Sequence, residues 1–229
     1  MRRFYKSVEV GEAEGGFEIL LDRRPVRTPA RQPLRVPTRA LADAIAREWE
    51  AQGPKVDPSA MPLTGLANAA IDRVAPDQDV FARGLAVYGE SDLLCYRADS
   101  PRALVDRQAQ QWDPILAWAR RRFDVDFEVV TGLIHRAQPS ATIERLRKAV
   151  EARSPFQLAG LSPLVTISGS LVVALALAEG ALDPETAWMA ATLDEQWQIE
   201  QWGEDAEARR ALDRRRAEFT AALAFLERL

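Results

Sequence analysis

Near Thr38 the hydrophobic pattern of the chain changes, and this change limits the folds that it can adopt. Before that point, apolar and polar residues alternate in short runs such as residues 4–10 and 17–21, which glycines and prolines separate. This pattern is typical of short antiparallel strands joined by tight turns. After Thr38, which can cap a first helix, apolar residues recur at spacings of three and four. The sequence therefore predicts an α+β fold: a small antiparallel β-rich N-terminal domain followed by a larger, mainly α-helical C-terminal domain.

One later helix has a clear start. Asp183 and Pro184 combine a capping residue with a proline at the first helical position. We expect this helix to continue through Trp202. Earlier in the chain, residues 76–79 interrupt the helical pattern and place a domain boundary near residue 80. The predicted domains are residues 1–80, which hold the strands and trailing helices, and residues 81–229, which are helical.

Composition excludes two kinds of partner. The net charge is −4 and the pI is about 5.3, whereas nucleic-acid binding needs an excess of clustered cations. The most apolar run, residues 161–177, is interrupted by polar residues and is barely long enough to span a bilayer. We expect it to form one or two buried helices, so no nucleic acid and no stable membrane insertion are predicted.

The chain has a single cysteine, Cys95, and a single histidine, His135. A zinc site needs three or four nitrogen, sulfur or carboxylate ligands, so no metal site is expected. Cysteine catalysis would have to pair these two residues. Cys95 lies in an apolar run, where a packed and inert thiol is expected.

No recognised catalytic motif is present. The sequence lacks a nucleophile elbow, a phosphate-binding loop and a dinucleotide fingerprint. Glu90 and Asp92 could act as a carboxylate pair, or could instead cap a helix. Asp194 and Glu195 are neighbours on a predicted helix and so do not face each other. The sequence therefore predicts no catalytic residues, no cofactor and no small-molecule substrate.

The segment at residues 193–205 contains an unusual carboxylate. In helical steps back from Trp202, Ile199, Glu195, Ala191 and Trp188 fall on one face. Carboxylates are rarely placed in such an apolar stripe unless they are paired or functional. Two interpretations remain open at this point: a structural acid that lies at the edge of the stripe or meets an internal arginine, and a docking surface with an acid at its centre.

Five segments, taken together and in order, resemble one family, the assembly chaperones that guard the α subunit of the catalytic head of the F-type ATP synthase. The similarity covers most of the chain, from about Phe4 to Gly203. The segments are residues 21–29 (LDRRPVRTP), 61–72 (MPLTGLANAAID), 90–97 (ESDLLCYR), 111–114 (QWDP) and 193–203 (LDEQWQIEQWG).

The resemblance implies a chaperone and not an enzyme. Such a protein binds the free α subunit and covers the surface that α later presents to the β subunit. A subunit built for an obligate interface exposes a large apolar patch when it is alone, so shielding it prevents aggregation. The family is best known from mitochondria, where a transit peptide precedes this region. None is visible here, and a bacterial protein of the cytoplasm is expected.

The resemblance also ties an acid within residues 193–203 to chaperone function. Glu195 is the best match, and Asp194 or Glu200 could be the equivalent residue. The implied partner-binding residues are Glu195, Gln198, Trp202, Asp194 and Gly203. Two alternatives from other classes are a small-molecule hydrolase that acts through Glu90 and Asp92, and a general protein-binding adaptor with no link to ATP synthase.

Overall fold

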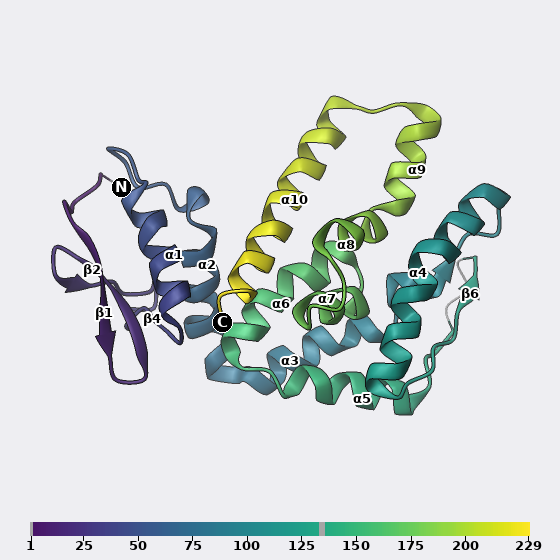
Figure 1. Ribbon diagram of the computed structural model, residues 1–229, viewed down its shortest axis with the longest axis horizontal. Coiled ribbons are helices and arrows are strands. Elements are labelled where there is room, and N and C mark those ends of the chain that lie inside the picture. The colour runs from purple at the N-terminus through teal and green to yellow at the C-terminus, as the bar shows by residue number, and fades with distance from the viewer. Residues whose placement is uncertain (1, 133–135) are drawn as a thin grey trace. The chain divides into compact units, whose positions relative to one another are not determined.

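The computed structural model describes residues 2–132 and 136–229 (Figure 1). N-terminal antiparallel strands precede a largely helical region, which confirms the predicted α+β class. The chain forms two compact units. The first contains the chain up to Gln78 together with Ser154–Gly160 and Ala224–Leu229, and the second contains Asp79–Arg153 and Leu161–Leu223.

The sheet of the first unit is built on a hairpin. Strands β1 (Val8–Ala13) and β2 (Gly16–Leu21) are antiparallel, and β2 also pairs with β3 (Arg24–Pro25) and β4 (Arg35–Val36). The first strand thus starts later than the alternation at residues 4–10 suggests. Tyr5 leaves the ladder because its hydroxyl donates to the Trp49 carbonyl oxygen at 2.6 Å.

The hairpin turn requires glycine at one position in particular. Gly16 has φ 151°, and a Cβ there would lie 2.4 Å from the Val36 carbonyl oxygen of the adjacent strand. Gly15 has φ 81°, and a Cβ there would meet no atom within 4 Å. Substitution of Gly16 therefore adds a backbone clash to conformational strain, whereas substitution of Gly15 introduces conformational strain alone.

We expect Gly16→Ala to lower the free energy of unfolding by about 3 kcal/mol, since it adds a clash to an unfavourable φ. Gly15→Ala, the matched control, should cost only about 1 kcal/mol. Denaturant unfolding of both variants measures the difference. Equal losses would show that the Val36 carbonyl moves aside easily.

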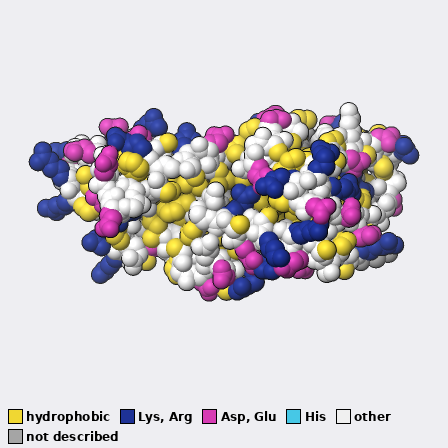
Figure 2. Space-filling model, turned by 60° about the horizontal axis from the view of Figure 1, so that its bottom comes forward, with side chains coloured by type: hydrophobic (Ala, Val, Ile, Leu, Met, Phe, Trp, Pro, Cys, Tyr) yellow, Lys and Arg dark blue, Asp and Glu magenta, His cyan; other side chains and the backbone are white. Residues whose placement is uncertain are grey.

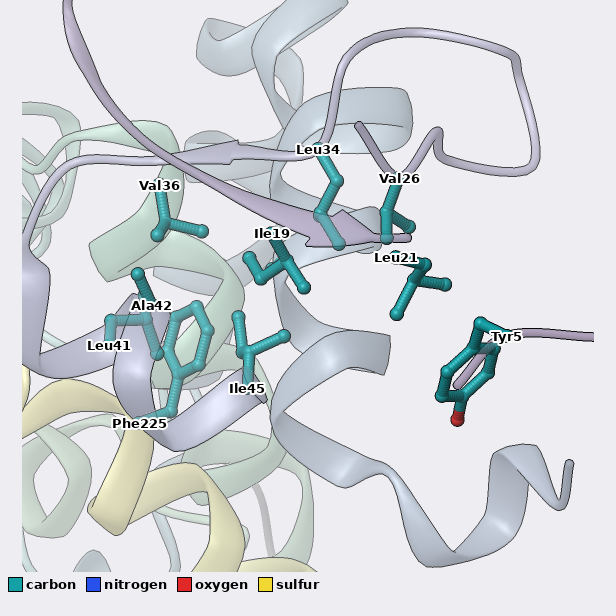
Figure 3. Packing of buried hydrophobic residues seen from close by; sticks show 11 residues of the cluster. Tyr5, Ile19, Leu21, Val26, Leu34, Val36, Leu41, Ala42, Ile45 and Phe225 are labelled. Atoms are coloured by element: carbon teal, nitrogen blue, oxygen red, sulfur yellow. The ribbon is translucent and has the colours of Figure 1, made fainter. Parts of the chain in front are cut away.

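The core of the first unit lies between the sheet and helix α1 (Arg39–Glu50) (Figure 3). Thr38 caps this helix as predicted, because its hydroxyl accepts the Leu41 N–H at 3.2 Å. Apolar side chains from both elements and from the C-terminal segment then close the core. They are Ile19, Leu21, Val26, Leu34, Val36, Leu41, Ala42, Ile45 and Phe225.

Helix α7 (Leu171–Ala178) forms the centre of the second unit, and every residue from Leu171 to Leu177 is buried. Gly169, at φ 65°, ends the preceding helix, and the Ser170 hydroxyl caps α7 by accepting the Val173 N–H at 3.0 Å. The apolar run at residues 161–177 is thus buried in two helices, as expected. No helix in the described ranges is both long and apolar enough to cross a membrane.

Helix α4 (Arg102–Phe123) packs against α7. Trp112 is fully buried there and donates its indole N–H to the Ala190 carbonyl oxygen at 2.9 Å. Of the alternating residues 123–129, Phe123 ends α4, Asp124 caps it with φ 53°, and residues 125–129 form a connection outside helix and strand. Only the following pair forms a strand, β6 (Val130–Thr131), parallel to β5 (Tyr96–Arg97). The remaining helices are α2 (Pro62–Ala69), α3 (Gln78–Ala86), α5 (Ser140–Glu151), α6 (Pro155–Ser168), α8 (Pro184–Ala191), α9 (Leu193–Trp202) and α10 (Ala206–Leu226).

The surface agrees with the charge composition. On the face drawn in Figure 2, basic and acidic side chains are interspersed over most of the area, and no broad basic region covers that face.

Candidate functional site

The helix expected to run from Asp183 through Trp202 is broken at Thr192. Helix α8 ends at Ala191, Thr192 has φ −113° and ψ 13°, and α9 starts at the next residue. The Thr192 hydroxyl donates to the Trp188 carbonyl oxygen at 2.8 Å, four residues back, and this bond closes the end of α8. Counting helical steps across this break is therefore wrong.

The apolar stripe that placed Glu195 between tryptophans consequently does not exist. Trp188 is 4% exposed and packs edge-to-face on Phe219, whereas Trp202 is 78% exposed. Glu195 is exposed on α9 and forms an ion pair with Arg215 of α10. The acid therefore meets an arginine at the surface and not an internal one, since the side chains of Glu195 and Arg215 are 47% and 38% exposed. A partner-binding role for Glu195 stays a prediction.

A different part of the same segment lines a groove. We call it the α4–α9 groove; its volume is about 690 Å³, and α4, α9 and residues 96–101 contribute its walls. It brings together three of the five predicted binding residues, Asp194, Gln198 and Trp202. Glu195 and Gly203 do not line it. Gly203 has φ 85° and ends α9, donating its N–H to the Ile199 carbonyl oxygen at 2.9 Å.

Asp194 is held in position by a buried glutamine. Gln108 of α4 is 2% exposed and donates its side-chain N–H to Asp194 Oδ1 at 2.8 Å. The Gln108 side-chain oxygen accepts the Ala98 N–H at 2.8 Å, which fixes the orientation of the amide. No ion pair joins Asp194 to a cation in the described parts of the chain. The groove thus contains an oriented carboxylate without an ion pair among the described residues, and the one arginine that lines the groove, Arg97, pairs with Asp113.

Gln108 is not among the binding residues predicted from the sequence, although its position on α4 indicates a role. Gln108 lies on the apolar face of α4, between Leu104 and Trp112. A buried amide needs hydrogen-bond partners, so its position indicated a polar contact from another element. Its partner lies 86 residues further along the chain and has no local signature.

The wall of the groove beside Asp194 is aromatic, and an ion pair holds it in position. Arg107 lies over the Trp197 ring, 5.1 Å from its centroid, and binds Glu200 at 2.8 Å. This hydrogen bond lowers the pKa of Glu200 and raises the pKa of Arg107, so both stay charged near neutral pH. Trp197 is held in this way, while Trp202 at the end of α9 projects its ring into solvent.

The proposed carboxylate pair of a hydrolase is not a reactive site. Asp92 is fully buried, and its carboxylate accepts the Leu94 N–H at 3.1 Å and the Val172 N–H at 3.0 Å. It therefore caps two helical segments, as in the structural alternative to a catalytic carboxylate pair that the sequence left open. Burial raises the pKa of Asp92 to about 6, opposed by the Ser170 hydroxyl and by these backbone N–H groups.

Cys95 is also structural. It is fully buried, as expected, and burial together with the charge of Asp92 raises the pKa of its thiol to about 12. His135, its only possible histidine partner, lies outside the described residues. Within the described chain, no group of three or more His, Cys, Asp or Glu side chains could hold a metal ion.

Comparisons with known proteins agree on one family. The model of the ATP12 chaperone protein family matches residues 2–120. The mitochondrial protein atp12 of Schizosaccharomyces pombe is 26% identical over 219 residues, which cover 90% of this chain and 75% of that protein.

Two solved structures extend the similarity over nearly the whole chain. Atp12 from Paracoccus denitrificans is 45% identical, with a TM-score of 0.95 over 99% of this chain and 97% of that one. Atu1473 from Agrobacterium tumefaciens, described as a putative chaperone, is 47% identical, with a TM-score of 0.93 over 99% of this chain and 85% of that one.

Proposed function

The chain belongs to the ATP12 family of chaperones, which serve ATP synthase assembly and are not enzymes, and we propose that it binds the free α subunit of the F-type synthase. In this proposal it covers the surface that α later presents to β and releases it when β arrives. The similar solved structures come from bacteria, and we propose the bacterial cytoplasm as the place of action.

The observation that carries the proposal is the α4–α9 groove. It combines an exposed tryptophan with an oriented carboxylate. An exposed tryptophan is a frequent energetic centre of a protein interface, because its ring buries a large area with little loss of conformational entropy. A ring that is 78% exposed on an isolated chain leaves that area available to a client.

Asp194 adds chemical selectivity to this surface. Its carboxylate is oriented by Gln108 and forms no ion pair in the described parts of the chain, so it suits an N–H donor or a basic side chain of the client. Trp202 on the same groove offers an exposed ring that attracts a cation. We therefore expect the client to place a basic or amide-bearing side chain beside Asp194 and an apolar group against Trp202.

Affinity capture from the native cell tests the proposal. The tagged chain should recover the ATP synthase α subunit, and Trp202→Ala should recover at most about a tenth as much, as for loss of a central interface tryptophan. Met189→Ala is the matched control, because Met189 is 40% exposed on α8 and does not line the groove. It should recover α as the unmodified chain does.

The outcomes separate the alternatives. Recovery of other proteins without α would favour a general adaptor. Equal recovery of α by both variants would leave the chaperone function intact but would move the binding surface away from the groove.

A further inference from the structure

The first unit contains a second concave surface, which the proposed function does not use. We call it the arginine-rimmed pocket; its volume is about 610 Å³, and all its lining residues belong to the first unit. Its apolar part comes from β2, from the residues before β1 and from α1, and its charged part from Arg24 and Arg27. The pocket therefore joins aromatic and cationic surface in one place.

The floor and one side of the pocket are aromatic. Tyr5 and Trp49 pack edge-to-face with ring centroids 5.7 Å apart, and Phe4 stands beside them, 60% exposed. The indole nitrogen of Trp49 is buried and has no acceptor within the described chain.

The rim carries a net positive charge. Arg24 and Arg27 are exposed, and neither forms an ion pair with a carboxylate in the described ranges. Arg27 donates only to the Arg31 carbonyl oxygen, at 2.9 Å. Lys and Arg side chains protrude at the left end of Figure 2, where the strands of the first unit lie.

The one acid that lines the pocket is already engaged. Asp22 accepts the N–H groups of Lys6 and Ser7, each at 2.9 Å, and these hydrogen bonds lower the pKa of its carboxyl. These hydrogen bonds tie the turn between β2 and β3 to the residues before β1, and the carboxylate stays ionised. The pocket thus carries one carboxylate and two guanidinium groups, a net positive charge, and each guanidinium can bind a carboxylate of a ligand with two parallel hydrogen bonds.

The fold accounts for most of the segment at residues 21–29, but not for these arginines. Leu21 and Val26 are core residues, and Thr28 donates its hydroxyl to Asp72 at 2.6 Å. The side chains of Arg24 and Arg27 contribute to neither the core nor an ion pair. Their presence at the mouth of an aromatic pocket thus lacks a structural explanation within this unit.

We propose that the arginine-rimmed pocket is a second docking site, which binds a peptide segment of acidic and apolar character. One bulky apolar side chain enters between Phe4, Tyr5 and Trp49, and flanking carboxylates pair with Arg24 and Arg27. Charge complementarity selects this occupant, since an apolar or basic peptide would leave the rim unpaired. The site is independent of the α4–α9 groove, because it lies in the other unit.

Binding of short synthetic peptides to the full chain tests this proposal. The probe alternates Glu and Phe; one control replaces each Glu by Lys, and a second replaces each Phe by Ser. The chain should bind the probe, and the double variant Arg24→Ala/Arg27→Ala should weaken that binding at least about tenfold. The matched control Arg47→Ala/Arg73→Ala removes two exposed cations of the same unit that do not line the pocket. This variant should change the affinity for the probe less than about twofold.

Several results would overturn the proposal. They are equal binding of the acidic and basic peptides, equal loss in both double variants, and binding of the probe that does not depend on its Phe residues. Anionic phospholipid vesicles form a further arm. If the chain binds them through Arg24 and Arg27 but ignores the probe, the surface recognises a membrane and not a peptide.

Discussion

Asp92→Ala is expected to lower the free energy of unfolding by about 3 kcal/mol at about pH 4.5. The fully buried carboxylate accepts the N–H groups of Leu94 and Val172, which begin two separate helical segments. Alanine leaves these buried donors without acceptors, at about 1–3 kcal/mol each. Denaturant unfolding of the variant beside the unmodified chain measures the loss.

The size of this loss should depend on pH in a defined direction. Burial raises the pKa of Asp92 from 3.8 to about 6, so between these values the folded chain holds its proton more firmly than the unfolded chain. The stability that Asp92 contributes is therefore greatest below about pH 4 and falls as the pH rises through about 6. We expect the loss in Asp92→Ala to be about 2 kcal/mol smaller at about pH 7.5 than at about pH 4.5.

Asp106→Ala is the control for this experiment. Asp106 is exposed on α4 and pairs only with Arg102, so its removal should change stability by less than about 0.5 kcal/mol. A loss in Asp92→Ala below about 1 kcal/mol at acid pH, or a loss that grows with rising pH, would contradict the structural role assigned to this carboxylate.

Asp194→Lys is expected to weaken binding of the α subunit at least about thirtyfold while the chain stays folded. Lysine cannot accept the hydrogen bond from Gln108, and its ammonium group would repel the basic client group expected in the groove. Calorimetric titration of isolated α measures the affinity, and thermal unfolding checks the fold. Glu195→Lys should reduce affinity less than about fivefold, because Glu195 is exposed and does not line the groove.

The comparison of these two variants shows which of the two carboxylates contributes to binding of the α subunit. Glu195→Lys also removes the ion pair with Arg215, so a small loss of stability is expected from it. If Glu195→Lys abolished binding and Asp194→Lys preserved it, the client would contact the outer face of α9 and not the groove.

Local signals predicted much of the fold. Thr38 and the Asp183-Pro184 pair mark helix starts because a capping side chain and a proline act on the next few residues only. The buried character of α7 follows from its unbroken apolar composition. Such features depend on residues that are close together in the sequence, so they can be predicted from it.

The features that local patterns could not predict depend on one residue or on a distant contact. Thr192 breaks the predicted helix through a hydroxyl that bonds back to Trp188, and a single threonine is a weak signal for such a break. The Gln108–Asp194 bond, and the inclusion of Ser154–Gly160 and Ala224–Leu229 in the first unit, join residues far apart in the chain. Local periodicity carries no information about which distant segments meet.

Light scattering of isolated α on warming measures whether the chain protects the free α subunit through the α4–α9 groove. With an equimolar amount of the unmodified chain or of Met189→Ala, α should stay clear. With Trp202→Ala or Asp194→Lys, α should scatter nearly as it does alone. Aggregation of α despite the unmodified chain would contradict the chaperone assignment, and full protection by both groove variants would contradict the site.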